Sequence, residues 1–239
     1  MRAALLLAWT FACGALAQGE VVPKVFVAEI HPGFQPAHAL QLDGDTLVYS
    51  IRFGADVQTR RITPSTAQWT AFRRALDRQN VWRWRGSYKA GVPDSTAWSL
   101  KIEYADRSLA AAGYGAGPDR AQDAALPKYA FTRYHLALQD LLGQPFVRRV
   151  SPIEVFDVEE LRLAATHPAA EKEEQWADFR DPAGKLHRVR VGEPVGGLGM
   201  LEKVGRSSVS LAVQVKDADG NSVRQERTVK LARRKPPAK

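Results

Sequence analysis

The chain has 239 residues, a mass of 26.4 kDa and a formal net charge of +8. Hydrophobic residues make up 45% and charged residues 25%, which excludes a collagen, a coiled coil and a wholly disordered chain. A chain of this length buries about 70% of its extended surface, so it needs neither disulfides nor metals to fold. It has no run of about 18 apolar residues, so we expect no transmembrane segment.

The first residues have the three parts of an export signal. A positive start precedes an apolar run over 3–12, and Ala15-Leu16-Ala17 supplies the small residues that signal peptidase requires. The sequence therefore predicts a signal peptide over 1–17, cleavage before Gln18 and an exported, most simply periplasmic, protein. The alternative is a lipoprotein acylated at Cys13, which is the one cysteine of the chain.

Residues 18–145 have the patterns of an α+β domain. Alternating β-forming residues indicate strands, and turn residues at 43–45 and 105–107 indicate two hairpins. Apolar residues three and four positions apart indicate two helices, which we expect to pack on an antiparallel sheet. The expected strands are 25–30, 39–42, 46–53, 57–62, 81–85, 96–104 and 108–114, and the expected helices are 64–80 and 128–142.

Local signals define the start and the buried face of the first helix. Thr63 is the expected N-cap, and Pro64 suits the first helical position because its ring fixes a helical φ. Trp69, Phe72 and Leu76 recur at helical spacing and predict one apolar stripe.

The remainder of the chain is expected to be all β. Residues 146–152 contain a proline and two arginines and are interpreted as a linker. Residues 153–232 then predict a small sandwich or open barrel, and 233–239 predict a basic disordered tail. The six expected strands are 161–165, 174–179, 186–191, 200–204, 209–215 and 223–231.

Motifs for metal, cofactor or catalytic chemistry are weak. Asp217, Asp219 and Asn221 fit the start of a calcium loop, but the glycine comes two positions too early, so we expect a hairpin turn. The glycines of 113–117 lack phosphate-loop spacing and are expected to form an irregular loop. The histidines lack metal-ligand spacing. We assign no catalytic residue, no metal and no cofactor, and expect a protein that is not an enzyme.

Arginines and tryptophans interleave between 73 and 85, as they do in some nucleic-acid sites. On the expected strand, however, Trp82 and Trp84 share the face opposite Arg83 and Arg85. We therefore expect the tryptophans in the core and the arginines in water, and no nucleic-acid partner. Where exposed, Trp82 and Trp84 are the candidates for contacting a ligand or carbohydrate.

One region resembles a known family. Residues 160–231 contain an Asp181-Pro182-Ala183-Gly184 turn, the strand end Arg190-Val191-Gly192, and a glycine-rich crossover at 196–199. With the closing strand at 227–231, they resemble the periplasmic β-domain of the pilus-assembly protein PilP. They resemble the homology region of the type II secretion component GspC more distantly.

The resemblance implies a non-enzymatic adaptor that binds a protein of the cell envelope, such as a secretin or an inner-membrane pilus component. It also implies partner contacts at Leu161, Arg162 and Leu163, with the leucines packed inward and the arginine outward. The alternative is an exported ligand- or carbohydrate-contacting protein that uses the aromatic first domain. A hydrolase with a spatially assembled site is a third possibility.

Overall fold

The computed structural model describes residues 21–90, 94–119, 123–217 and 222–231. The expected signal peptide with Cys13, and the expected basic tail at 233–239, lie outside these residues. Two separate hydrophobic clusters occur, one built from residues between 26 and 146 and the other from residues between 153 and 213. No helix of the described part is both long and apolar enough to cross a membrane.

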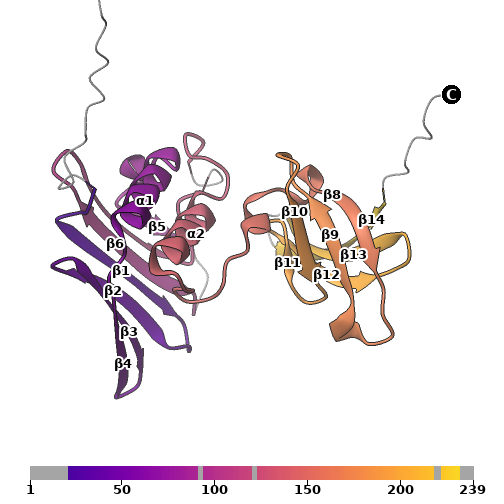
Figure 1. Cartoon of the computed structure of the whole chain (residues 1–239), viewed down its shortest axis with the longest axis horizontal. Helices are drawn as coiled ribbons and strands as arrows, with labels where there is room; N and C mark the ends of the chain where they lie inside the picture. The colour runs from indigo at the N-terminus through magenta and orange to yellow at the C-terminus, as the bar shows by residue number, and fades with distance from the viewer. Residues whose placement is uncertain (1–20, 91–93, 120–122, 218–221, 232–239) are drawn as a thin grey trace, which may run out of the picture.

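The first cluster lies between a seven-stranded sheet and two helices on one of its faces (Figure 1). The sheet order is β4-β3-β2-β1-β6-β7-β5, and all neighbours are antiparallel except β5 and β7. The strands are β1 Val25–Pro32, β2 Ala37–Asp43, β3 Thr46–Phe53, β4 Asp56–Ile62, β5 Ser87–Lys89, β6 Thr96–Glu103 and β7 Ser108–Tyr114. The helices are α1 Thr66–Arg78 and α2 Ala130–Leu142.

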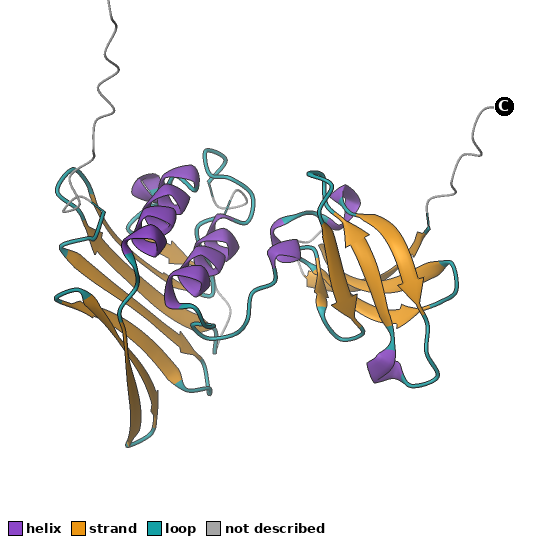
Figure 2. Ribbon diagram, viewed as in Figure 1, coloured by secondary structure: helices purple, strands orange, loops and turns teal. Residues whose placement is uncertain are grey.

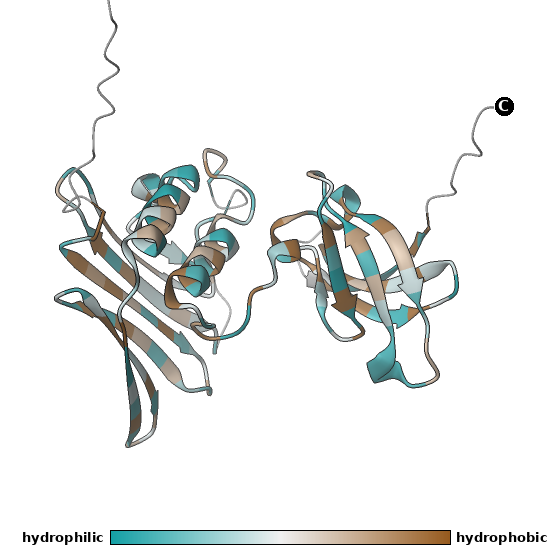
Figure 3. Cartoon of the chain, in the orientation of Figure 1, coloured by the Kyte–Doolittle hydropathy of each residue, from teal (hydrophilic) through white to brown (hydrophobic). Residues whose placement is uncertain are grey.

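The expected periodicities produce this arrangement. Along β1, Phe26, Ala28 and Ile30 are buried while their neighbours are only partly buried, as an alternating strand with one covered face requires. In α1, Trp69 and Phe72 are buried as expected. Figure 3 shows the resulting alternation of hydrophobic and hydrophilic residues along the strands.

Two local predictions in this unit were wrong. The N-cap of α1 is Ser65, not Thr63, because Ser65 and Gln68 form a reciprocal capping box. Residues Val81–Arg83 form a short 3-10 helix rather than a strand, and the chain at Trp84 turns extended. The expected strand 108–114 is β7 and contains Gly113, while the chain leaves the strand at Gly115.

The second cluster is enclosed by two sheets that face each other, which gives a sandwich-like unit (Figure 2). The sheet orders are β10-β9-β8 and β11-β12-β13-β14. All six expected strands are present, and β11 is an additional short one. The strands are β8 Arg162–His167, β9 Trp176–Arg180, β10 Leu186–Arg190, β11 Pro194–Val195, β12 Gly199–Val204, β13 Ser208–Lys216 and β14 Ser222–Lys230.

The segment 146–152 is packed against both units. Phe146 is 3% exposed and belongs to the first cluster, and the backbone N–H of Val150 donates to Gln139 of α2. Arg148 donates through two nitrogens to Glu154, whose carboxylate is buried. The arginine therefore compensates a buried charge, and the segment has a defined path.

The N-terminal end of α2 contacts the second unit. The Tyr129 hydroxyl donates to Asp157 at 2.7 Å, and Lys128 forms an ion pair with the same carboxylate. Arg133 donates to the carbonyl of Val155 at 2.7 Å. A Cβ atom on Gly197 would lie 2.0 Å from the Tyr129 ring, so this close approach requires glycine.

Candidate functional site

Strand β8 has one unpaired edge, because it ends the three-stranded sheet. Leu161 and Leu163 are 5% and 3% exposed, and Arg162 between them is exposed. The expected orientation of these three residues is therefore confirmed, while their contact with a partner stays a prediction. Within the described residues, β8 hydrogen-bonds to β9 as its only ladder partner. Its outer edge can add an extended strand from another chain.

Two features shape this edge. The pairing register shifts between Leu163 and Ala165, so Ala164 forms a bulge that bends the strand. Further along, the Thr166 hydroxyl donates to the carbonyl of Arg206 at 2.9 Å, which ties the end of β8 to the second sheet. The part of the edge open to a partner is therefore centred on Arg162.

The candidate ligand-contacting tryptophans do not form a shared surface. Trp84 is 5% exposed and packs on Trp98, Phe131 and Tyr134, so it lies in the core as expected and its ring is not available to a ligand. The two tryptophans do not share a face, because the 3-10 turn breaks the alternation of a strand. Trp82 is partly buried, and its Nε1–H donates to Asp77 at 2.7 Å.

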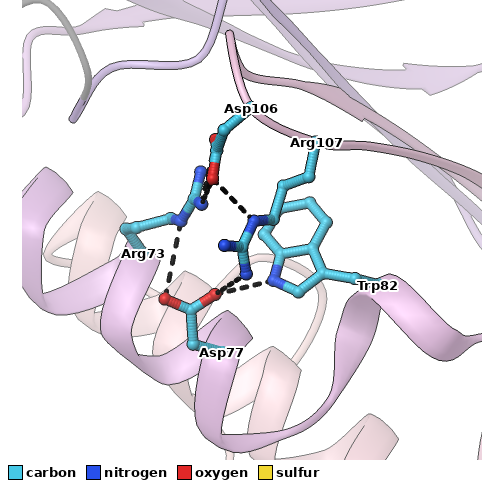
Figure 4. Close-up of polar contacts among 5 residues, drawn as sticks. All are labelled: Arg73, Asp77, Trp82, Asp106 and Arg107. Atoms are coloured by element: carbon cyan, nitrogen blue, oxygen red, sulfur yellow. Dashed lines mark hydrogen bonds and ion pairs between the residues drawn. The ribbon is translucent and has the colours of Figure 1, made fainter.

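Trp82 belongs instead to a charged cluster between α1 and the β6–β7 turn (Figure 4). Arg73 donates to Asp106 at 2.8 Å and lies over the Trp82 ring, and Arg107 donates to both Asp77 and Asp106. The hydrogen bond from Arg73 lowers the pKa of the Asp106 carboxyl below its ordinary value. Two positive and two negative groups thus satisfy one another, and the cluster fixes the hairpin to the helix.

A groove of about 460 Å³ lies between α1 and α2. Its lining is mixed, with alanines and larger apolar residues beside the polar Gln68, Arg78, Gln79 and Arg133, and Asp140 is its one carboxylate. Burial raises the pKa of Asp140. A single carboxylate without an adjacent base or nucleophile does not supply a catalytic pair.

The histidines are dispersed. Within the described ranges, no group of three histidine, cysteine or acidic side chains is close enough to hold a metal ion. His187 contacts Asp181 at 2.9 Å in the expected Asp-Pro-x-Gly turn, and His135 packs on Phe131. Burial lowers the pKa of His135 to about 4, so this ring is neutral at ordinary pH.

Comparisons with known proteins agree with the sequence resemblance. The family model described as "Pilus assembly protein, PilP" matches residues 132–231, which is less than half of the chain. No curated protein matches. The expected resemblance of residues 160–231 to PilP is therefore confirmed, and the match extends further, into α2.

Solved PilP structures are among the similar ones. The solution structure of PilP from Pseudomonas aeruginosa is 25% identical, covers 38% of this chain and 81% of that chain, and gives a TM-score of 0.33. A domain of the type IV pilus biogenesis lipoprotein PilP from Pseudomonas aeruginosa PA01 is 26% identical, with coverages of 35% and 94% and a TM-score of 0.30. A domain of the Neisseria meningitidis PilP pilot protein is 19% identical, with coverages of 38% and 80% and a TM-score of 0.32.

Proposed function

We propose that this chain is an exported, non-enzymatic adaptor of pilus assembly that binds a protein of the cell envelope through its C-terminal β-domain. The match of residues 132–231 to the pilus-assembly family carries this proposal. The unpaired edge of β8 supports it, because a sheet edge is a means of binding another protein without a catalytic pocket. The partner is a component such as a secretin or an inner-membrane pilus protein, and the site of action is the periplasm.

Binding at β8 has two physical parts. The buried leucines at 161 and 163 fix the strand to its own core, so its free backbone groups are presented without further ordering. A partner strand pairs with these groups and gains affinity from main-chain hydrogen bonds. Arg162 stands exposed at this edge and attracts an acidic partner, which raises the rate and specificity of association more than the affinity.

Two substitutions at Arg162 test the edge. Arg162→Glu reverses the charge and keeps the backbone, whereas Arg162→Pro removes a backbone donor. Binding is measured with purified periplasmic domains of the secretin and of the inner-membrane pilus proteins from the same organism. We expect both variants to weaken binding to one of these domains, and the proline variant to weaken it more.

The control is Arg224→Glu on β14, the edge strand of the other sheet, where the arginine pairs with Glu202. It makes the same charge change away from β8 and should leave binding unchanged. Thermal unfolding of each variant verifies that the β-domain is folded. An exposed charge reversal changes stability by about 0.5 kcal/mol or less, whereas proline in a strand costs more, so this check matters most for Arg162→Pro. The proposal would be contradicted if wild type and both Arg162 variants bound a domain with equal affinity. It would also be contradicted if wild type bound none of these domains.

A further inference from the structure

The outer face of the sheet β10-β9-β8 gathers positive charge. Strands β9 and β10 alternate along their length, and β8 alternates up to its bulge, so that one set of residues packs into the second cluster and the other set faces outward. The outward set includes four exposed arginines from three strands. These are Arg162, Arg180, Arg188 and Arg190.

The strand register brings these arginines together. Arg162 of β8 lies directly opposite Arg180 of β9, although they are distant in sequence. Arg188 of β10 lies opposite Asp178, and Arg190 lies opposite Trp176. Like charges placed opposite each other destabilise a sheet. The pair Arg162 and Arg180 is therefore a cost to the fold that an anionic partner would relieve.

The charges on this face are only partly neutralised from within. Asp178 is the carboxylate on the face, and it contacts Arg188 at 3.3 Å and His167 at 3.9 Å. Arg180 donates to the carbonyl of Gly184, which orients the guanidinium without neutralising it. Among the described residues, the side chains of Arg162 and Arg190 form no ion pair.

The tryptophan on this face is covered on both sides. The His167 ring stacks on Trp176 with centroids 3.2 Å apart, and the Arg188 guanidinium lies 3.5 Å from the same centroid. Two groups so close to one ring cannot share a face of it, so the indole is sandwiched. A sugar or a nucleobase would need a free ring face for stacking, and this surface offers none.

We propose that this face, defined by Arg162, Arg180, Arg188 and Arg190 with Trp176 at its end, docks an acidic surface of a protein partner. The planar guanidinium forks suit carboxylates, which they bind through two parallel hydrogen bonds. The inference rests on the proposed function and deepens it, because Arg162 is common to the β8 edge and to this face. It specifies the chemistry of the partner: beside the strand that pairs with β8, the partner carries carboxylates that lie over β8, β9 and β10.

The charges of the loop between β8 and β9 determine how an acidic partner is oriented on this face. Glu171, Glu173 and Glu174 lie in the β8–β9 connection, at the end of the sheet where Trp176 begins its strand. Arg162 and Arg180 lie at the opposite end. The positive potential is therefore highest at the Arg162 end, and the most acidic part of the partner faces that end.

The test uses a short peptide of alternating glutamate and threonine as the probe, with a glutamine–threonine peptide as the neutral control. Backbone amide shifts of the full exported chain are followed by NMR during titration. We expect the acidic peptide to shift amides of β8, β9 and β10, and the neutral peptide to shift none. The double variant Arg188→Glu/Arg190→Glu should weaken the apparent affinity about tenfold or more, and salt should weaken it as well.

The matched control is Lys203→Glu/Arg206→Glu, which makes the same charge change outside this face and should retain peptide binding. Shifts located elsewhere, equal binding of both peptides, or equal loss in the control variant would overturn the inference. The inference would also be overturned if the chain bound phosphatidylglycerol vesicles but not the peptide, and if the Arg188→Glu/Arg190→Glu variant abolished that vesicle binding. If that variant still binds the pilus domain that Arg162→Pro loses, the inference fails and the proposed function stands.

Discussion

The two hydrophobic clusters of the molecule are built from different side chains. The first contains many aromatic side chains packed against one another, and Trp84 is in edge contact with Trp98 and Tyr134. The buried residues of the second are aliphatic except for Phe179. Both units have an exposed edge strand, β4 in the first and β8 in the second, so an edge alone does not distinguish them. The second unit adds the four exposed arginines of the β10-β9-β8 face. We therefore propose that the partner contacts lie in the second unit, within the residues that the family model matches.

The largest effect is expected from Phe179→Ala, because it removes the one aromatic ring among the buried residues of the second cluster. The cost is about 3–5 kcal/mol, since a cavity stays where the ring was. Phe72→Ala is the matched change in the first cluster, where surrounding aromatic residues also lose contacts. Calorimetry should show that each variant lowers the melting temperature of one unit and leaves that of the other nearly unchanged.

We also propose that the two expected domains, 18–145 and 153–232, fold independently, and this pair of variants tests it. A single transition that moves equally in both variants would show that the two units unfold together. The two hydrophobic clusters would then belong to one cooperative folding unit rather than to two.

The contact between the units is expected to be the next most sensitive point. Gly197→Ala places a methyl group on the Tyr129 ring, and overpacking of this kind costs about 1–3 kcal/mol. Gly86→Ala is the control, because its added Cβ would meet its nearest neighbour at an ordinary 3.8 Å. Small-angle scattering should show a wider distribution of distances between the units in Gly197→Ala. Identical scattering profiles would contradict the view that Tyr129 holds the units together.

A smaller effect is expected within the first unit from Arg73→Lys. Lysine keeps the positive charge but lacks the planar fork that reaches Asp106 and stacks on Tyr104. We expect a loss of about 1 kcal/mol in the free energy of unfolding. Hydrogen exchange should accelerate at the β6–β7 turn. If exchange rises equally over the whole unit, the cluster does not act locally on the hairpin.

The smallest expected effect depends on pH. The hydrogen bond from Lys128, followed by that from Tyr129, lowers the pKa of Asp157. The ionised carboxylate therefore stabilises the docked state, and this contribution is complete above the ordinary pKa of about 3.8 and is lost as pH falls through the lower folded value. Asp157→Asn should remove this dependence, with a difference of about 1 kcal/mol or less at neutral pH. Urea midpoints measured from pH 3 to pH 6 would reveal it, and parallel curves for both proteins would contradict it.

Strand positions were predictable because alternation is a strong signal wherever one face is buried. Alternation around Trp82 and Trp84 predicted a strand wrongly, because so short a stretch does not distinguish a strand from a 3-10 turn. The N-cap was assigned to Thr63 on the strength of the following proline. The Ser65 and Gln68 spacing was the better signal, because it satisfies two backbone groups at once.

The candidate edge was predictable only in part. The outward position of Arg162 follows from its leucine neighbours. The choice of that strand as the partner contact came from the family resemblance. Its juxtaposition with Arg180 depends on strand pairing and on the bulge at Ala164, which sequence periodicity does not specify. The packed path of 146–152 was not predicted, because it depends on the buried carboxylate of Glu154, which Arg148 compensates.

Helix α2 belongs to both halves of the molecule. Leu138 and Leu141 anchor it in the first cluster, while Tyr129 and Arg133 at its other end contact the second unit. A pull on the β-domain is consequently transmitted along two parallel routes, through these noncovalent contacts and through the covalent segment 146–152. The contacts with Asp157 and Val155 are noncovalent and far weaker than the polypeptide, so we expect them to break first. Under tension, the β-domain would separate from α2 while remaining tethered to it.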